Sequence, residues 1–384
     1  MIFAIPLAWL QLIREKVRLL IALAGIAFAV LLMMIQMGFR DALFDASVTL
    51  HQNLDADIVI LSPQSTNLIA LKSFSRRRLF QAAGVEGVQS FSPLYLQLAL
   101  WRNPDTKGTR QILLLGVNPE DKSFTLPEFL ENRDRLKRPD VVLFDRLSRE
   151  QFGPIGQWFD EGKTVETEIA DRKVSVAGLF NLGTSFAADG NLITSDLNFL
   201  RIVDSRSPGL IDLGLLTLAP GEDAATMVRT IQDRIPDDVM VLTKQEFIEF
   251  EQRYWQTSTS IGFIFNLGSA MGFVVGMVIV YQILYTDVSD HLAEYATLKA
   301  MGYKSRFLFS VVLQEAIILS VIGFIPGLGA SAGLYSLTKN ATGLPIGLTI
   351  ERGITVFLLT STMCLVAGII AMRKVQAADP ADIF

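Results

Sequence analysis

The residues that most enzymes use for catalysis are sparse in this chain of 384 residues. Its two histidines, His51 and His291, have no partner at the spacing of a metal site or of a Ser-His-Asp triad. Gly156 and the triplet from Gly162 to Thr164 resemble a phosphate-binding loop, but the five residues between the two glycines are one too many. Acidic pairs such as Asp160-Glu161 are better explained as an exposed turn. We therefore expect no catalytic, metal or cofactor site.

Four long apolar runs dominate the hydropathy pattern. They cover residues 19–39, 257–286, 307–337 and 354–372. At ~1.5 Å per helical residue each run crosses a hydrocarbon core of ~30 Å, so each is predicted to be a transmembrane helix. A cleaved signal peptide is the alternative for the first run. That run, however, is longer than the ~7–15 residues of a signal core, and no small-x-small cleavage site follows before Arg40.

Lysine and arginine residues near the ends of these runs predict the orientation. Short basic loops stay in the cytoplasm, whereas long domains are translocated largely regardless of their charge. Residues 1–18, 287–306 and 373–384 are therefore expected in the cytoplasm, and residues 40–256 and 338–353 outside. The basic residues that decide this are Arg14, Lys16, Arg18, Lys299, Lys304, Arg306, Arg373 and Lys374.

The outer segment, residues 40–256, is predicted to fold as a large α+β domain. Short β-branched or alternating runs bounded by Gly, Pro, Asn or Asp predict its strands. The single cysteine, Cys364, excludes an intramolecular disulfide, so the domain must be stabilised by its own core. The net charge of -5 and the pI of 5.3 give no indication of nucleic acid binding. Strands are predicted at 57–61, 111–115, 141–144 and 174–176, and helices at 76–83 and 223–234.

A helix is predicted at each end of the outer domain. After the first transmembrane run, apolar or small residues continue at spacings of three and four, which extends that helix beyond the membrane. Thr243 to Glu246 form a capping box that begins a helix before the second run. We predict that the two helices pair as a stalk; the alternative is that both lie on the domain as ordinary amphipathic helices. The stalk residues are Phe39, Leu43, Leu50 and Leu54 on the first helix and Phe247, Phe250 and Tyr254 on the second.

The cytoplasmic segment 287–306 is predicted to contain a short amphipathic helix. Its acidic residues lie toward the N-terminal half and Lys299 lies near the end, which suits the helix dipole, and Gly302 is placed to end the helix. A helix that rests on lipid usually carries a basic polar face. This face is largely acidic, which favours docking in a groove of a partner protein. The candidate contact residues are Glu294, Leu298, Lys299, Met301 and Gly302.

Two further features lie inside the transmembrane runs. Glu315 is the only carboxylate in any of the four runs. A charge there is costly unless it faces the bundle interior or lies near the interface, so Glu315 is either a functional residue or a structural one near the interface. Glycines spaced by four let helices approach closely, and one such face is a candidate homodimer contact. These packing glycines are Gly268, Gly272 and Gly276 in the second run and two pairs in the third, Gly323 with Gly327 and Gly329 with Gly333.

The order of these parts along the chain resembles the MacB/FtsX superfamily of ABC-transporter permeases: one transmembrane run, a large external domain and three further transmembrane runs. Residues 294–303, with an acid, a small and apolar stretch, a lysine and Ala-x-Gly, resemble its cytoplasmic coupling motif. Residues 314–316 and the glycines after them resemble its third-span pattern. Residues 8–26 resemble its amphipathic elbow, and residues 379–384 its C-terminal signature. Among subfamilies the chain is most similar to the cyanobacterial DevC-type permeases.

The resemblance implies a homodimeric, multi-pass permease of the bacterial inner membrane that is not itself an enzyme, since the chain lacks the fused ATPase of MacB. Its partners would be a separate ABC ATPase subunit, a periplasmic membrane-fusion adaptor and a TolC-like outer-membrane duct. Mechanotransmission from the ATPases would expel a lipid-like or amphiphilic cargo, a glycolipid if the DevC similarity holds. Two alternatives stay open: a membrane-anchored receptor with an external ligand-binding domain, and an FtsX-like activator of periplasmic cell-wall hydrolases.

The predicted orientation can be tested with single cysteines in a Cys364→Ser background. We expect a membrane-impermeant maleimide to label Ser185→Cys but not Ser289→Cys in intact cells, because the basic short loops keep residues 287–306 in the cytoplasm. Permeabilised cells, in which both positions are labelled, are the control. Labelling at position 289 alone in intact cells would show the opposite orientation.

Overall fold

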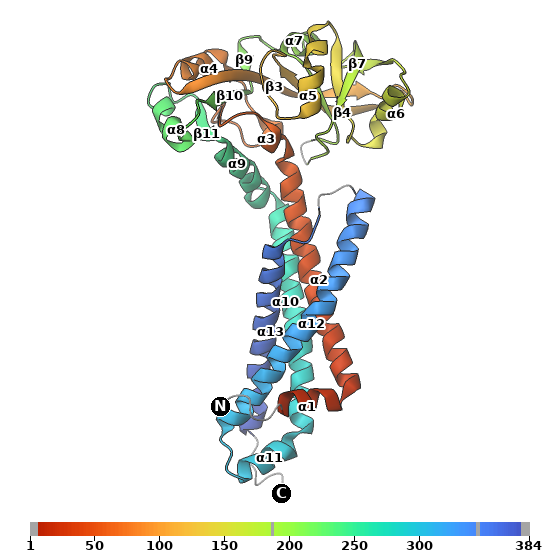
Figure 1. Cartoon of the computed structure of the whole chain (residues 1–384), viewed down its shortest axis with the longest axis vertical. Coiled ribbons are helices and arrows are strands. Elements are labelled where there is room, and N and C mark those ends of the chain that lie inside the picture. The colour runs from red at the N-terminus through yellow and green to blue at the C-terminus, as the bar shows by residue number, and fades with distance from the viewer. Residues whose placement is uncertain (1–6, 186–187, 343–345, 378–384) are drawn as a thin grey trace. The chain divides into compact units, whose positions relative to one another are not determined.

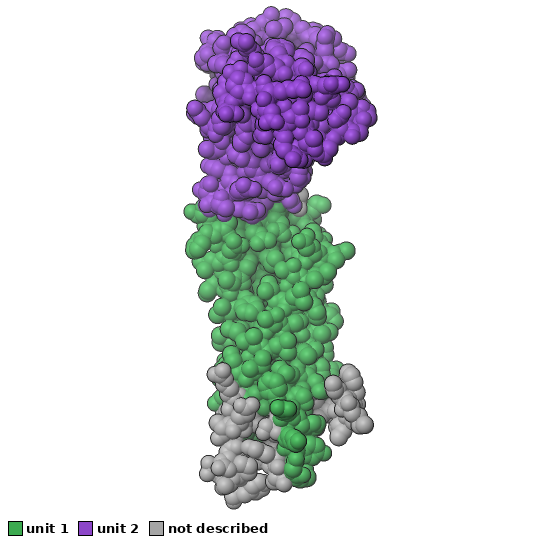
Figure 2. Space-filling model, turned by 90° about the vertical axis from the view of Figure 1, so that its left-hand side faces the viewer, with its two compact units in different colours: residues 1–42, 260–384 green, residues 43–259 purple. Residues whose placement is uncertain are grey.

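The computed structural model describes residues 7–185, 188–342 and 346–377. The chain divides into two compact units, which Figure 2 shows in different colours. The membrane unit comprises residues 1–42 and 260–384, and the α/β unit comprises residues 43–259. Each unit has its own hydrophobic core and is described by itself.

In the described part of the chain, four helices of the membrane unit are long and apolar enough to cross a membrane. This confirms the predicted fold class, in which one membrane helix precedes the α/β domain and three follow it. A short helix lies before the first of them and another between the second and third. In chain order the six helices are α1 (Leu7–Arg14), α2 (Lys16–Ser47), α10 (Ser260–Asp290), α11 (Leu292–Ala300), α12 (Ser305–Thr342) and α13 (Ile350–Ala377).

The helices of the membrane unit share one apolar core. Helix α13 packs along both α10 and α12 (Figure 1). Met33, Val280 and Met363, from three different helices, are fully buried in this core. The opposite side of α10 exposes large apolar residues at helical spacing, as expected of a helix that faces lipid. These are Phe263, Leu267, Met271, Val274 and Val278.

The α/β unit is built on one nine-stranded sheet in the order β11-β1-β10-β3-β4-β8-β5-β7-β6. All strand pairs are antiparallel except β4 with β8 and β5 with β7. A two-stranded sheet of β2 (Phe74–Ser75) and β9 (Leu210–Ile211) lies beside it. The nine strands are β1 (Ile58–Leu61), β3 (Val88–Arg102), β4 (Thr109–Val117), β5 (Val141–Asp145), β6 (Val165–Ile169), β7 (Arg172–Phe180), β8 (Asn191–Ser195), β10 (Leu213–Leu218) and β11 (Met240–Thr243).

The long strand β3 joins the two halves of this sheet. Its first half pairs with β10 and its second half with β4. Near its end Trp101 also pairs with Ile169 of β6, so the strands from β3 to β6 curl until the last one meets the first. The Trp101 indole is fully buried inside the curl and donates to the Phe152 carbonyl at 3.0 Å.

Helices cover both faces of the sheet, so its strands are apolar on both sides. Along β4, Ile112 and Leu114 lie in one core and Leu113 and Leu115 in the other, as the alternation of side chains in a strand requires. The predicted strands are confirmed within β1, β4, β5 and β7, and the predicted helices as α4 and α8. The helices of this unit are α3 (Thr49–Asn53), α4 (Arg76–Ala83), α5 (Pro127–Asn132), α6 (Ile155–Asp160), α7 (Asp196–Ile202), α8 (Ala224–Gln232), α9 (Lys244–Thr257) and the 3-10 turns η1 (Leu68–Ala70), η2 (Arg133–Lys137) and η3 (Glu150–Phe152).

A buried carboxylate organises the loops at the end of β5. The Asp145 side chain accepts hydrogen bonds from the amides of Leu147, Leu182 and Gly183 at 2.8–3.0 Å and from the Asn191 side chain at 2.8 Å. Burial raises the pKa of the Asp145 carboxyl, and these hydrogen bonds oppose that rise. The carboxylate thus holds together loops that follow two different strands.

We expect Asp145→Ala to lower the free energy of unfolding of the α/β unit, because it leaves several buried donors without an acceptor, at ~1–3 kcal/mol for each unsatisfied group. Thermal unfolding of the full chain in lipid nanodiscs measures this loss. The control is Asp238→Ala, which removes an exposed ion pair with Arg78 and should change stability by no more than ~1 kcal/mol. Equal unfolding temperatures of the two variants would contradict the structural role of Asp145.

Candidate functional site

The segment between α10 and α12 contains a separate short helix, α11. The sequence predicts a short amphipathic helix within residues 287–306, and the first four residues of that segment instead continue α10. Helix α10 continues to Asp290 and the helix is interrupted at His291, whose Nδ1 lies 3.0 Å from the Asp287 carbonyl oxygen. Helix α11 then runs from Leu292.

Gly302 ends α11. Its φ of 95° lies in the left-handed region, which glycine adopts without strain. The Tyr303 amide donates to the Leu298 carbonyl at 3.1 Å, the closing hydrogen bond of a Schellman motif. A side chain at position 302 would strain this turn, so the glycine fixes the path of the chain as it leaves α11.

The side chains of α11 divide into an anchoring face and an exposed face. Leu292 and Leu298 are half-buried against a small apolar cluster, whereas Glu294 and Met301 are exposed, Met301 to 63%. The Lys299 side chain lies outside the described residues. Among the candidate contact residues, Leu298 therefore holds α11 in place, and Glu294 and Met301 are accessible to a partner. The cluster beneath α11 consists of Val288, Val312 and Met372.

An ion cluster joins the first turn of α2 to the last turn of α10. The Arg18 guanidinium lies 2.7 Å from Glu15 and 3.4 Å from Asp287, and it also pairs with Asp290. The sequence identified Arg18 only as a basic residue that sets orientation. Because 269 residues separate Arg18 from Asp287, no local spacing could have predicted the pair.

Glu315 lies in α12 and is fully buried. Among the described residues, neither of its carboxylate oxygens has a hydrogen-bond partner, and the same holds for Asp287 Oδ2. The carboxylate that the sequence singled out therefore lies inside the bundle and not at its lipid-facing surface.

Five of the predicted packing glycines contact α2. A Cβ on Gly268, Gly272 or Gly276 would meet Gln36, Leu32 or Ala29, respectively, and Gly276 also approaches Met363 of α13; a Cβ on Gly323 or Gly327 would meet Ile26 or Val30. These faces are occupied within one chain. A Cβ on Gly329 or Gly333, in the second half of α12, would meet nothing within 4 Å.

A second ion pair holds the other end of α2. The Arg352 guanidinium, nearly buried at the start of α13, donates to Asp41 Oδ2 at 2.9 and 3.0 Å and to the Gly347 carbonyl at 2.7 Å. It also lies over the Tyr335 ring, whose hydroxyl bonds to the Met34 carbonyl. Sequence reasoning missed this pair, since the contact joins residues 311 positions apart.

The predicted stalk residues fall partly inside the α/β unit. Helix α2 ends at Ser47, whose hydroxyl donates to the Phe44 carbonyl at 2.7 Å, and α3 follows after one residue. The continuous helix expected up to Leu54 is therefore interrupted, because the hydroxyl competes for a carbonyl at the helix end. The core of the α/β unit contains Leu50, Leu54 and Phe247, and Phe250 packs against it. Two further stalk residues, Leu43 and Tyr254, are half-buried. Phe39 instead packs against the core of the membrane unit.

Helices α3 and α9 also enclose a buried polar pair. The predicted capping box of Thr243 and Glu246 begins α9. The His51 ring packs 4.4 Å from the Phe247 ring, and its Nε2 lies 3.7 Å from Glu251. Glu251 is fully buried and accepts hydrogen bonds from the Leu68 amide and the Trp255 indole, both at 2.8 Å.

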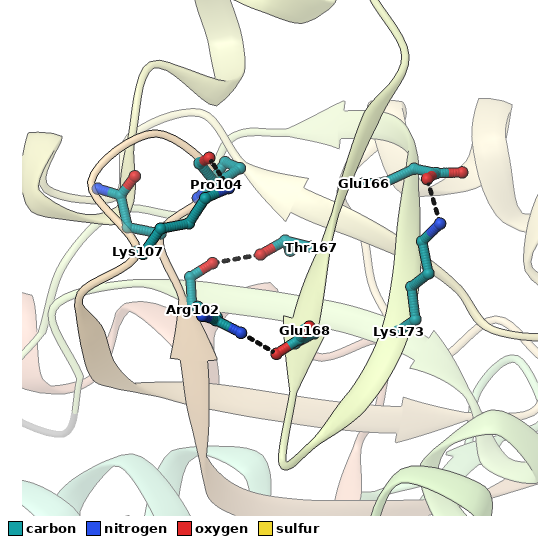
Figure 3. A pocket seen from close by; sticks show the side chains of 8 residues that line it. Arg102, Pro104, Lys107, Glu166, Thr167, Glu168 and Lys173 are labelled. Carbon is teal, nitrogen blue, oxygen red and sulfur yellow. Dashed lines mark hydrogen bonds and ion pairs between the residues drawn. The ribbon is translucent and has the colours of Figure 1, made fainter.

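A surface pocket of about 260 Å³ lies where β6 meets the end of β3 (Figure 3). Its charged side chains satisfy one another: Arg102 pairs with Glu168 at 2.7 Å and Lys173 with Glu166 at 2.5 Å. The Lys107 ammonium donates to the Pro104 carbonyl at 2.6 Å. None of the predicted site residues lines this pocket, and its charges are already paired.

Two family models match the chain. The model of the MacB-like periplasmic core domain matches residues 19–234, and the model of the FtsX-like permease C-terminal region matches residues 266–380. The first covers more than half of the chain, and the second contains α11, α12, α13 and most of α10.

Proteins similar in sequence include two kinds of named transport protein. An uncharacterized ABC transporter permease of Mycobacterium tuberculosis, in strains CDC 1551 and H37Rv, is 20% identical over 311 residues, which is 80% of this chain and 77% of that protein. The pyoverdine export ATP-binding/permease protein of Pseudomonas syringae pv. tomato is 22% identical over 184 residues, which is 47% of this chain and 27% of that protein.

Solved structures of low similarity match the α/β part. The periplasmic region of MacB from Actinobacillus actinomycetemcomitans has a TM-score of 0.35 at 12% identity and covers 51% of this chain and 92% of its own. The extracellular domain of the ABC-type transporter YknZ from Gram-positive bacteria has a TM-score of 0.33 at 15% identity and covers 49% of this chain and 100% of its own.

The close packing of α12 on α2 yields a stability prediction. A Cβ at Gly327 would lie 2.7 Å from Val30 Cβ and 2.8 Å from the Ala27 carbonyl oxygen, so Gly327→Ala should cost ~1–3 kcal/mol by overpacking. Gly353→Ala, in α13, enters open space and should be neutral or stabilising by up to ~1 kcal/mol through helix propensity. Thermal unfolding in lipid nanodiscs compares the two variants. If Gly327→Ala were as stable as Gly353→Ala, α12 would not pack this closely on α2.

Proposed function

The chain belongs to the MacB/FtsX family of ABC transporter permeases, and from this premise we propose that it is the membrane subunit of an exporter in a bacterial inner membrane. Both termini and α11 face the cytoplasm, and the α/β unit faces the periplasm. A separate ABC ATPase subunit docks on α11 and supplies the energy of ATP hydrolysis. This chain itself passes on motion and catalyses no reaction.

The observation that carries this proposal is the construction of α11. Leu298 packs the helix against the bundle and Gly302 fixes its end, while Glu294 in the first turn of α11 and Met301 directly after its last residue are exposed. A large apolar side chain that is 63% exposed in a segment that also carries an exposed acidic residue suits a groove of a partner protein better than water. Because α11 is anchored, a displacement imposed by a docked ATPase passes to α10 and α12.

From there we propose transmission through the two connections between the units. Helix α2 is continuous from Lys16 to Ser47, and α9 precedes α10 after a bend at residues 258–259. At ~1.5 Å per residue a helix of this length reaches beyond a ~30 Å hydrocarbon core. We propose that α2 and α9 act as levers. Levers work only if the arrangement of the two helices has at least two states that ATP binding favours differently.

The remaining partners follow the family resemblance. We propose a homodimer that uses the open face of Gly329 and Gly333 on α12, where helices can approach closely. A periplasmic membrane-fusion adaptor and a TolC-like outer-membrane duct would continue the export path from the α/β unit. The proposed cargo is lipid-like or amphiphilic, and a glycolipid if the chain is a DevC-type permease.

The proposal is tested by purifying the full chain from its native membrane and identifying the ATPase that copurifies with it. Met301→Asp places a charge in the proposed apolar contact and should weaken ATPase binding by about 2 kcal/mol or more, which is roughly thirtyfold. The control is Leu348→Asp, an equally drastic change of an exposed apolar residue between α12 and α13. If no ABC ATPase copurifies, or if Met301→Asp binds it as well as Leu348→Asp does, the docking role of α11 is wrong.

A further inference from the structure

Two membrane helices, α2 and α13, are not joined directly to α11 by the chain; α13 contributes Met372 to the apolar cluster beneath α11, and α2 contributes none of its described residues to that cluster. Helix α11 follows α10 after His291 and precedes α12 after Lys304, so both neighbours are joined to it by the chain. Glycine faces of these two helices meet α2 at Ala29, Ile26 and Val30. Polar contacts with them are also present in the second half of α2, where Tyr335 of α12 bonds to the Met34 carbonyl and Arg40 donates to Asn266 of α10.

Arg18 supplies a directional contact at the right place. It lies in the first turn of α2, and its guanidinium bonds to Asp287 and Asp290 in the last turn of α10, directly before α11. We propose that Arg18 is a positioning residue that makes α2 follow the displacement of α11. This inference rests on the proposed function and names the residue through which the motion enters α2.

The surroundings of the ion cluster make a lost contact costly. The Asp287 side chain is 8% exposed, and Asp287 Oδ2 has no hydrogen-bond partner among the described residues. Two basic side chains face the other carboxylate oxygen, Arg18 at 3.4 Å and His291 at 3.7 Å. Without Arg18, this nearly buried carboxylate would keep only His291 as a basic partner among the described residues.

The cluster is also closely packed. The cavity beside Arg18 and Asp287 holds about 10 Å³, too little for more than one water molecule. Apolar side chains of α1, α2, α10 and α12 line it and shield Asp287, whereas the Arg18 and Asp290 side chains stay 26% and 51% exposed. These apolar residues are Leu12, Leu19, Ala22, Ile283, Leu284 and Leu319.

The test uses the full chain in complex with its copurified ATPase, in a Cys364→Ser background. Spin labels at Asp45→Cys, near the end of α2, and at Arg253→Cys, in α9, report the arrangement of the two helices by pulsed electron paramagnetic resonance. In the parent complex we expect a non-hydrolysable ATP analogue to shift the ratio of two distance populations by about fivefold or more, the usual range of allosteric coupling. Arg18→Met keeps the apolar stem, and should abolish this shift while ATPase copurification stays unchanged.

Lys16→Met is the matched control, because it removes an exposed cation two residues away. It should keep the shift. Arg18→Lys keeps the charge and should restore part of the shift that Arg18→Met loses. A role of Arg18 in bundle stability alone would instead lower the unfolding temperature and ATPase copurification together.

Asp290→Asn provides a second variant that does not depend on the folding of Arg18→Met, since Asp290 is half exposed. It should reduce the shift, and the double variant with Arg18→Met should be no worse than the more affected single one, because the two residues act as a unit. A full shift in both Arg18→Met and Asp290→Asn would overturn the positioning role and leave the proposed function intact. If the parent complex forms without any shift, or no ATPase copurifies, the proposed function fails and this inference fails with it.

Discussion

The membrane unit depends on how closely α10 and α12 approach α2. Lipid offers no hydrophobic force between helices, so their association rests on van der Waals contact and polar pairs. Glycines provide the contact: a Cβ at Gly276 would lie 2.5 Å from Ala29 Cβ, and one at Gly327 would lie 2.7 Å from Val30 Cβ. Ion pairs then hold each end of α2, with Arg18 at one end and Asp41 at the other. The centre of α2 is fixed by shape and its ends by charge.

The α/β unit is constrained differently, because both faces of its sheet are buried by helices. Every central strand must therefore be apolar on both sides, which explains why β4 and β5 read as nearly continuous apolar runs. The helices nearest the chain connections share these cores: Leu50 of α3 and Phe247 of α9 are buried with the strands. A force applied to these helices consequently acts on the sheet itself and not on a loosely attached neck.

Local sequence patterns predict much of this architecture. Hydropathy located the membrane helices, alternation located strands, and glycine spacing located the faces along which α10 and α12 pack, since each signal arises from residues a few positions apart. The partners of those faces were not predictable. The Arg18–Asp287 and Asp41–Arg352 pairs join residues 269 and 311 positions apart, and the burial of Glu251 depends on an amide from another segment. Such contacts are set by tertiary packing, and a single sequence does not show which distant residues are brought together.

The two connections between the units differ in a way that matters for a mechanical function. Helix α2 passes residue 42 without a break, whereas the return connection is interrupted between Thr257 and Ser260. A continuous helix resists bending and carries a displacement along its axis, while a short non-helical link absorbs changes of angle. In the proposed mechanism, a stiff connection would transmit a shift while the pliant one takes up the change of angle that accompanies it. Two stiff connections would move the domain only as a block, so the bend after α9 is as much a requirement of such a mechanism as the length of α2.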